Sequence, residues 1–189
     1  LALAVTTTGF AQEGGEADAA MAEMMAAWQE YAAIGPPHED LQRRVGDWDV
    51  TVKFWYAPGA PPEVSEGSST VEAIMGGRYI LEHFKSTMPD GKPFKGMGLV
   101  GYDNIKERFV AMWVDVMSSG LLTAESTSHS DDFSRIEFHG ESPDPVAGRY
   151  KDQRSVETWS GPDTRVMEAW EEGPGGAEVK VMEITYVRR

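Results

Sequence analysis

From Val45 onward, apolar and polar residues alternate in short runs that clusters of Gly, Pro, Asp and Asn interrupt. The first run is VGDWDVTVKFWY. Its apolar side consists of Trp48, Val50, Val52, Phe54 and Tyr56. Because successive side chains of a strand point to opposite faces, this alternation is typical of a half-buried β-strand. Similar runs of roughly 7–12 residues follow, so the pattern predicts an all-β domain of about ten strands.

The segments between these runs predict how the strands are connected. Consecutive runs are joined by short turns such as Gly76-Gly77, PDGKP at residues 89–93 and Asp103-Asn104. Short connections join antiparallel neighbours, which favours an up-and-down meander. A meander of this many strands protects its edges best by closing on itself. We therefore expect an antiparallel up-and-down β-barrel.

The segment before Val45 has helical spacing instead. Its apolar stripe consists of Met21, Met24, Met25, Trp28 and Tyr31 or Ala32. The turn at 35–37, Gly-Pro-Pro, is expected to end one N-terminal amphipathic helix of about 15 residues. We expect this helix to dock on its own domain; the alternative is a lid or a partner-binding face. The expected organisation is a spacer and helix at residues 12–37 and a barrel domain at 38–189.

The first residues indicate a compartment. LALAVTTTGFAQ carries no charge and runs from an apolar patch into small residues that end at Ala11. This is typical of the last part of a secretory signal peptide cleaved after Ala11, whose basic part would lie before residue 1. We therefore expect residues 1–11 to be a signal-peptide remnant and the protein to be periplasmic or secreted. The alternative is an apolar terminus with no targeting role. No stretch approaches the roughly 18 apolar residues of a membrane helix.

Composition narrows the classes of partner. The 189 residues contain 17 Lys+Arg and 31 Asp+Glu, which gives a formal charge of -14. Such an acidic chain repels a phosphate backbone or an anionic membrane surface, so we expect no nucleic-acid partner. The chain contains no cysteine, which excludes disulfides and thiolate chemistry. Its length is sufficient for one sizeable core.

Several motifs together resemble a known family. Gly46-Asp47-Trp48 resembles the Gly-x-Trp start of lipocalin-like (calycin) barrels, in which the Trp plugs one barrel end. The wider pattern comprises His38 before Leu41, GDWDVTVKFWYAPGAPP, GGRYI, KPFKGMGLVGYDN, MWVDVMSSG and MEITYVRR. From about Met21 to Arg189 this pattern resembles the bacterial family called domain of unknown function 1579. The resemblance implies a lipocalin-like barrel and supplies no catalytic residue.

The run FVAMWVDVM at 109–117 holds one carboxylate among apolar residues. Both faces of this strand are apolar, so Asp115 should point into a largely buried environment beside Trp113. A buried carboxylate needs a partner, which can be an arginine, backbone N–H groups or a ligand. The alternative is that Asp115 only caps the turn at 118–120 through backbone N–H groups.

The run YKDQRSVETWS at 150–160 has no continuous apolar face, so part of it should line the barrel interior with polar groups. Arg154 is the basic candidate for that interior. It could pair with Asp115 or bind a ligand carboxylate with two hydrogen bonds. The alternative is an ordinary surface arginine.

Two further features concern the barrel wall. Glu82 and His83 are adjacent and face opposite ways, and the flanking residues favour Glu82 inward. Gly96 and Gly98 share one face of their strand, which is therefore flat. The space could hold a ligand or the Trp48 ring, or the glycines could serve barrel curvature alone.

Three functions remain open. The favoured one is binding of a small, largely apolar molecule in the barrel, and the candidate ligand-binding residues are Trp48, Phe54, Glu82, Trp113, Asp115, Arg154 and Trp170. The second is a pocket enzyme, an isomerase or hydrolase, that uses Asp115 or Glu82 as a base. The third is a protein-interaction module whose barrel is filled by its own side chains.

No cofactor is identified from the sequence, and no catalytic residue is assigned. The four histidines are scattered, so no spacing announces a metal site. Glu137 and His139 share one strand face, where we expect a structural role for the imidazole. The oligomeric state is left open.

Overall fold

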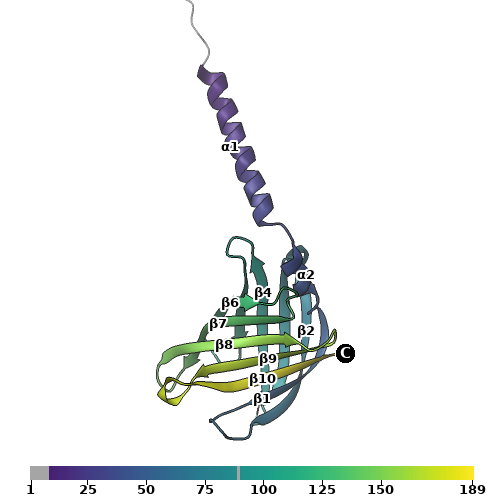
Figure 1. Cartoon of the computed structure of the whole chain (residues 1–189), viewed down its shortest axis with the longest axis vertical. Coiled ribbons are helices and arrows are strands. Elements are labelled where there is room, and N and C mark those ends of the chain that lie inside the picture. Colours follow the sequence, from purple (N-terminus) through teal and green to yellow (C-terminus); the bar gives the residue numbers. More distant parts are fainter. Residues whose placement is uncertain (1–8, 89) are drawn as a thin grey trace, which may run out of the picture. The chain divides into compact units, whose positions relative to one another are not determined.

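The computed structural model describes residues 9–88 and 90–189 and confirms the barrel. Its strands form one closed antiparallel sheet in the order β1-β10-β9-β8-β7-β6-β5-β4-β3-β2, an up-and-down barrel (Figure 1). The strands are β1 Gly46–Phe54, β2 Glu63–Ile74, β3 Tyr79–Thr87, β4 Pro93–Asp103, β5 Arg108–Asp115, β6 Leu122–His129, β7 Arg135–Asp144, β8 Arg149–Trp159, β9 Thr164–Glu172 and β10 Glu178–Arg188. The predicted turn at Gly76-Gly77 lies between β2 and β3, and the turn at Asp103-Asn104 begins with the last residue of β4.

The chain divides into two compact units. The first ends at Ala33 and contains helix α1, Gly9–Tyr31. The second, Ile34–Arg189, contains helix α2, Pro36–Gln42, the barrel and two 3-10 turns, η1 Met75–Gly77 and η2 Pro174–Gly176.

Helix α1 is longer than the sequence pattern predicts. Its 23 residues include the segment expected to be a spacer. Ala, Glu and Gln are good helix formers and outweigh the two glycines of that segment. The bond after Ala11, the expected cleavage site, lies within α1, whereas Leu1–Thr8 lie outside the described residues.

The Met/Trp stripe of α1 is exposed. Met21, Met24, Met25 and Trp28 all leave about half of their surface or more in contact with solvent, between 47% and 60%. The docking of this helix on the barrel stays a prediction. Neither α1 nor any other helix in the described part of the chain combines the length and the apolar character that a membrane span requires.

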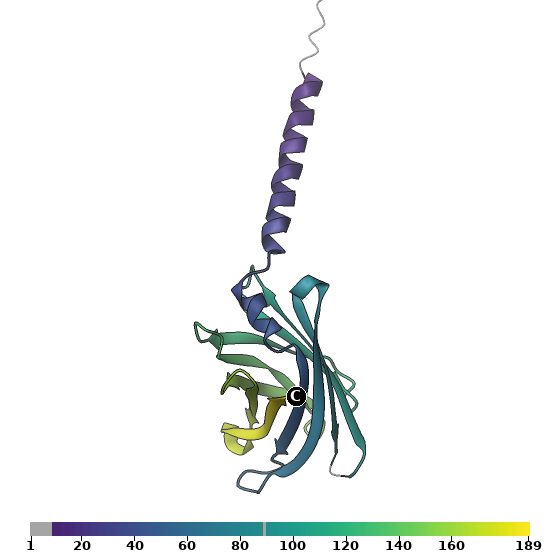
Figure 2. The same cartoon turned by 90° about the vertical axis from the view of Figure 1, so that its right-hand side faces the viewer.

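Helix α2 begins where the sequence pattern predicts only a helix end. Pro36 and Pro37 occupy its first two positions, where their missing N–H groups cost nothing. The Gly35 N–H, left over at the N-terminus, donates to Nδ1 of His38 at 3.2 Å. Leu41 is fully buried in the barrel core, so α2 covers one end of the barrel (Figure 2). We call this the closed end.

Closure at that end depends on the Gly-x-Trp segment. Trp48 is fully buried, as expected for the plug, and its Nε1 donates to the Arg44 carbonyl at 2.9 Å. The Arg188 guanidinium stacks on the Trp48 ring at 4.2 Å. Gly46 adopts a φ of 134°, and a Cβ there would lie 2.8 Å from Nη1 of Arg188. A side chain at position 46 would therefore disturb the stacked arginine.

Strand pairing fixes which residues face inward. Trp48 pairs with Arg188, Val50 with Tyr186, and Val52 with Ile184. The fully buried side chains that share this inward face include Trp48, Val50, Phe109 and Ile136. The turns β1–β2, β3–β4, β5–β6, β7–β8 and β9–β10 all lie at the end opposite α2, because each strand reverses direction. We call that the open end.

Candidate functional site

A charged network crosses the barrel interior just inside the closed end. Its centre is Arg165 on β9, which pairs with Trp159 on β8 and Tyr186 on β10. Its Nη1 donates to Oε2 of Glu157 at 2.9 Å, and its Nη2 lies 3.8 Å from Oε1 of Glu82. The guanidinium also lies 3.6 Å from the centre of the Tyr186 ring. Arg165 is thus buried between two carboxylates and an aromatic face.

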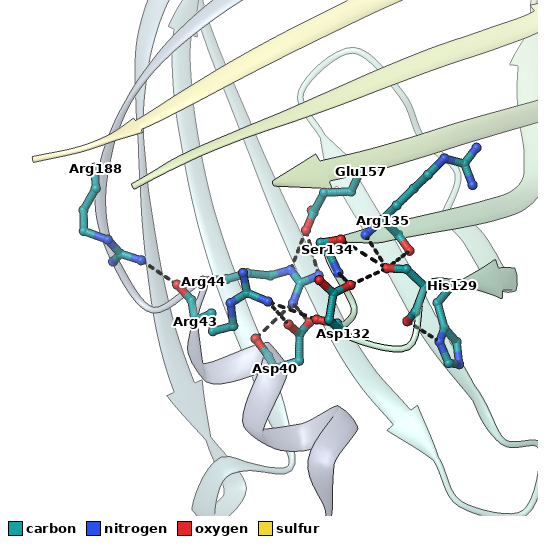
Figure 3. Close-up of polar contacts among 10 residues, drawn as sticks. Asp40, Arg43, Arg44, His129, Asp132, Ser134, Arg135, Glu157 and Arg188 are labelled. Carbon is teal, nitrogen blue, oxygen red and sulfur yellow. Dashed lines mark hydrogen bonds and ion pairs between the residues drawn. The ribbon is translucent and has the colours of Figure 1, made fainter. Parts of the chain in front are cut away.

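Arg44, just after α2, extends this network to the helix (Figure 3). Its Nε donates to Oε1 of Glu157 at 2.8 Å, and its Nη1 donates to Oδ2 of Asp40 at 2.7 Å. Glu157 is therefore held by two arginines. We call Asp40, Arg44, Glu157, Arg165 and Glu82 the floor network, because it lies beneath the open part of the barrel.

Glu82 is the member on β3, and it faces inward as the alternation predicts. The Ser69 hydroxyl donates to its Oε1 at 2.5 Å. Its side chain keeps 16% of its surface exposed although it points into the barrel. Solvent therefore reaches the level of the floor network.

Burial and charge set the protonation states here. Burial acts to raise the pKa of Glu157, but the guanidinium groups of Arg44 and Arg165 outweigh it and hold the pKa below its ordinary value. Burial opposes the charge of Arg165, yet the carboxylate of Glu157 raises its pKa. Burial, followed by the charge of Glu82, raises the pKa of Tyr186 well above 10.0. At neutral pH, Glu157 is ionised and Tyr186 keeps its proton.

Two donors beside the network have no partner. The Nε1 of Trp159 and the Nε of Arg165 are buried and find no acceptor in the described part of the chain. The side chains themselves are more than nine-tenths buried, with 7% and 4% exposed. An unsatisfied buried donor costs about 1–3 kcal/mol, so these two N–H groups indicate a place for an acceptor.

Between the floor network and the open end, the inward side chains are less completely covered than at the closed end. Apolar residues that the strand register turns inward stay half-buried, namely Val52, Phe94, Trp113, Phe138, Met167 and Met182. Ala111, Ala124 and Gly140 are inward neighbours on three successive strands. The two alanines are small and fill little of the interior. Gly140 instead allows β7 to approach β6 closely, because a Cβ there would lie 2.3 Å from the Thr123 carbonyl oxygen. We call the interior between the floor network and the open end the lumen.

The open end of the lumen carries a polar cluster. Glu171 accepts hydrogen bonds from Ser142 Oγ at 2.8 Å and from Gln153 Nε2 at 3.2 Å. Lys151 Nζ lies 2.6 Å from its Oε2. A surface depression of about 540 Å³ is lined by Gln153 and Glu171 together with residues of the outer wall such as Arg154. The depression therefore extends from the inner to the outer side of the barrel wall at the open end.

Asp115 lies at the open end. It caps the turn that follows β5 through backbone N–H groups, which is the alternative considered from the sequence. Its Oδ1 accepts hydrogen bonds from the N–H groups of Met117 at 2.7 Å and Ser118 at 3.0 Å. Its other oxygen accepts one from Trp113 Nε1 at 2.9 Å. Asp115 thus caps the turn and also fixes the Trp113 indole.

The flat face of Gly96 and Gly98 is occupied by that indole and not by Trp48. A Cβ at Gly96 would lie 2.2 Å from a carbon of the Trp113 ring, and one at Gly98 would lie 3.2 Å from another. The glycines therefore allow the ring to lie against the backbone of β4. Trp113 lies on the inward face of β5, and its contact with a ligand stays a prediction.

The structure contradicts the inward placement of Arg154 and Trp170. They pair with each other across β8 and β9 on the outer face of the barrel. Arg154 donates to both carboxylate oxygens of Glu178 at 2.7 Å and stacks on the Trp170 ring at 4.1 Å. The expected pair with Asp115 is excluded, because the two side chains lie on opposite faces of the wall. β8 is polar on both sides, so alternation alone could not assign its faces.

The remaining candidates lie at the two ends of the barrel. Trp48 is on the closed-end side, packed 6.0 Å from the Trp159 ring centre. Phe54 lies on the inward face at the open end, 37% exposed, and its ring packs on Tyr56 with centres 4.7 Å apart. Trp48 and Phe54 thus lie at opposite ends of the barrel interior. Their contact with a ligand stays a prediction.

His38 lies in helix α2, and His83 and His139 lie on the outer face of the barrel. His83 faces outward, 3.7 Å from Glu72, and His139 lies 3.4 Å from Glu137 on the outer face. Within residues 9–88 and 90–189, no three His, Asp or Glu side chains gather in a way that could hold a metal ion.

Comparison with known families identifies the chain at family level. The model of a family described as protein of unknown function (DUF1579) matches residues 33–188. This range covers α2 and the whole barrel to within one residue of the C-terminus. The chain belongs to this family. No curated protein matches the sequence.

Solved structures with the same barrel include two with clear similarity. The S-type phycobiliprotein lyase CPES from Guillardia theta is 14% identical, with 81% of this chain and 92% of its own covered and a TM-score of 0.57. Rv2717c from M. tuberculosis is 13% identical, with coverages of 83% and 99% and a TM-score of 0.55. At these identities the likeness establishes the fold alone.

Proposed function

We propose that this member of the DUF1579 family binds a small, largely apolar molecule in the lumen of its barrel. The observation that carries the proposal is the set of inward-facing apolar side chains that stay half-buried, among them Trp113, Phe138 and Met167. At the closed end, by contrast, Trp48 and Phe109 are fully buried. Covering the remaining apolar surface would stabilise a complex by about 25 cal/mol per Å².

The arrangement favours binding over acid–base catalysis. A general base at neutral pH needs a carboxylate whose pKa is raised. Glu157 is ion-paired with two arginines and its pKa is lowered, while Glu82 already accepts a hydrogen bond from Ser69. Asp115 is occupied by the turn and by the Trp113 indole. The carboxylates of the interior therefore serve structure and orientation in this proposal.

Filling the lumen tests the proposal. Ala124→Phe places a large side chain on the inward face beside Ala111 and Gly140. Thr123→Phe is the matched control, because Thr123 is exposed on the outer face of the same strand. With the neutral fluorescent probe N-phenyl-1-naphthylamine, we expect the inward variant to bind about 10-fold or more weakly, a loss of about 1.4 kcal/mol. The outward variant should bind like the parent chain.

Two results would contradict lumen binding. One is equal affinity of both variants for the probe, which would place the probe on the outer surface. The other is the absence of saturable binding to the parent chain. Circular dichroism and urea unfolding of both variants would show that a loss of binding does not reflect a loss of fold.

We also propose that the protein acts in the periplasm or outside the cell after removal of residues 1–11. The support is the uncharged apolar patch followed by small residues up to Ala11. Intact-mass analysis of protein from its native host should show a chain that starts at Gln12. Ala11→Arg should block this cleavage, and a cytoplasmic chain that retains residues 1–11 would contradict the proposal.

A further inference from the structure

The two residues that carry the unpartnered donors are cross-strand neighbours on the inward face of the barrel. Trp159 on β8 pairs directly with Arg165 on β9, and side chains of such a pair start about 5 Å apart. The Trp48 ring touches both, with its centre 6.0 Å from the Trp159 ring centre and 5.4 Å from the Arg165 guanidinium. One acceptor atom placed between them could satisfy both N–H groups.

We propose that the lumen ligand carries a neutral acceptor oxygen, such as a ketone, ester or amide carbonyl, and that Trp159 Nε1 and Arg165 Nε donate to it. The apolar remainder of the ligand extends toward the open end past Trp113 and Phe138. This inference rests on the proposed function, because it assigns the polar end of the molecule that the lumen binds.

The charges around the pair favour a neutral oxygen over a carboxylate. The terminal nitrogens of Arg165 already face Glu157 and Glu82, and those of Arg44 face Asp40 and Glu157. Arg43, whose guanidinium lies 4.6 Å from the Trp159 ring centre, also pairs with Asp40, so three guanidinium groups balance the three carboxylates. A ligand carboxylate would add an unbalanced negative charge beside Glu157 and Glu82 in a poorly hydrated site, where repulsion between like charges is strong.

A cationic ligand does not fit the unpartnered atoms either. Both are N–H donors, and an ammonium group offers only further donors. A carbonyl oxygen has two lone pairs and accepts two hydrogen bonds without adding charge. The donor set therefore matches a carbonyl best.

The site is within reach of the lumen. Glu82 and Glu157 point inward on either side of Arg165, and their side chains keep 16% and 12% of their surface exposed. In this proposal the head of a slender ligand reaches the floor network between these carboxylates, where it meets Arg165, and Trp159 is the neighbour of Arg165 on β8.

Matched probes of one chain length test the inference. We would measure how 2-octanone, octane and octanoate displace N-phenyl-1-naphthylamine from the parent chain and from Trp159→Phe, which keeps an aromatic ring but removes the N–H. We expect 2-octanone to bind the parent at least about 10-fold more tightly than octanoate. The variant should lose about 10-fold for 2-octanone and stay within about 2-fold for octane. Trp170→Phe on the outer face is the matched control.

The outcomes separate this inference from the proposed function. If octane and 2-octanone displace the probe from parent and variant alike, the donors bind only water and the inference falls while lumen binding stands. A preference for octanoate also overturns it. If none of the three displaces the probe, both proposals fail.

A second measurement covers the case in which the variant does not fold. In ¹⁵N-labelled parent chain, the indole N–H resonance of Trp159 should move downfield on addition of 2-octanone and stay in place on addition of octane. An unchanged Trp159 resonance at saturating 2-octanone overturns the inference.

Discussion

The closed end and the open end of the barrel are built by the same strands and by the same alternation, yet their interiors differ. At the closed end, Trp48 and Phe109 have no exposed surface. Toward the open end, inward residues of the same kinds, Trp113 and Phe138, stay half-buried. The difference lies in what covers them. Helix α2 packs on the closed end, whereas hairpin turns border the open end.

The floor network separates these two regions. It ties α2 to the barrel, because Arg44 binds Asp40 within the helix region and Glu157 on β8. It also places charge at the inner limit of the lumen, where Arg165 and Glu82 face each other. The comparison therefore indicates that the closed end supplies most of the stability, and in the proposed function the open half holds the ligand.

The largest expected loss of stability follows from a substitution at the closed end. Trp48→Ala removes a fully buried ring together with its hydrogen bond to the Arg44 carbonyl, and we expect a loss of about 3–5 kcal/mol in the free energy of unfolding. Trp113→Ala removes a half-buried ring at the open end and should cost only about 1–2 kcal/mol. Urea unfolding of both variants measures the difference. Equal losses would mean that the two regions are packed equally.

A somewhat smaller effect concerns the floor network and its pH dependence. Glu157→Gln removes the carboxylate that Arg44 and Arg165 share. It should lower the free energy of unfolding by about 3 kcal/mol at pH 7. The folded-state pKa of Glu157 is lowered from 4.5, so its contribution is present above that pH and is lost as the pH falls through the folded pKa. The difference in unfolding free energy between parent and variant should therefore shrink as the pH falls below 4.5.

Arg154→Gln is the matched control for this comparison. Its ion pair with Glu178 lies on the outer face, where such pairs contribute about 0–1 kcal/mol. A Glu157→Gln variant as mild as this control at neutral pH would contradict a stabilising role for the network.

The alternation predicted most of the barrel because one side of each well-patterned strand is apolar. The inward face of β1, the inward direction of Glu82 and the plug role of Trp48 follow from this pattern and from the Gly-x-Trp motif. Helix α2 was not predicted as such. Its signal was present, since Pro36 and Pro37 suit the first positions of a helix as well as the end of one.

The floor network could not be predicted from alternation. β8 carries polar residues on both faces, so the pattern offers Arg154 as the basic candidate for the interior. The faces of β8 and β9 are set by pairing around the closed barrel, in which Glu157 faces Met167 and Arg165 faces Trp159. One local signal existed, because Trp159 shares a face with Glu157 and a large aromatic ring usually turns to the core.

The smallest expected effect tests the open end. In Asp115→Asn the amide oxygen can still accept from the N–H groups of the turn, so the unfolding free energy should change by less than about 1 kcal/mol. The hydrogen bond to Trp113 Nε1 loses its charge, and we expect a measurable shift in indole fluorescence.

The double variant Asp115→Asn with Arg154→Gln then tests whether residues on the inner and outer faces of the barrel wall are energetically coupled. Asp115 is bound to Trp113 and to its own turn, whereas Arg154 is bound to Glu178 and Trp170 outside. Because the two residues share no partner, their effects on stability should add within about 0.5 kcal/mol. A larger coupling energy would mean that the barrel wall transmits strain from its outer surface to the Trp113 side of the lumen. The packing of the open end would then depend on the outer face of the wall, although no contact joins Asp115 to Arg154.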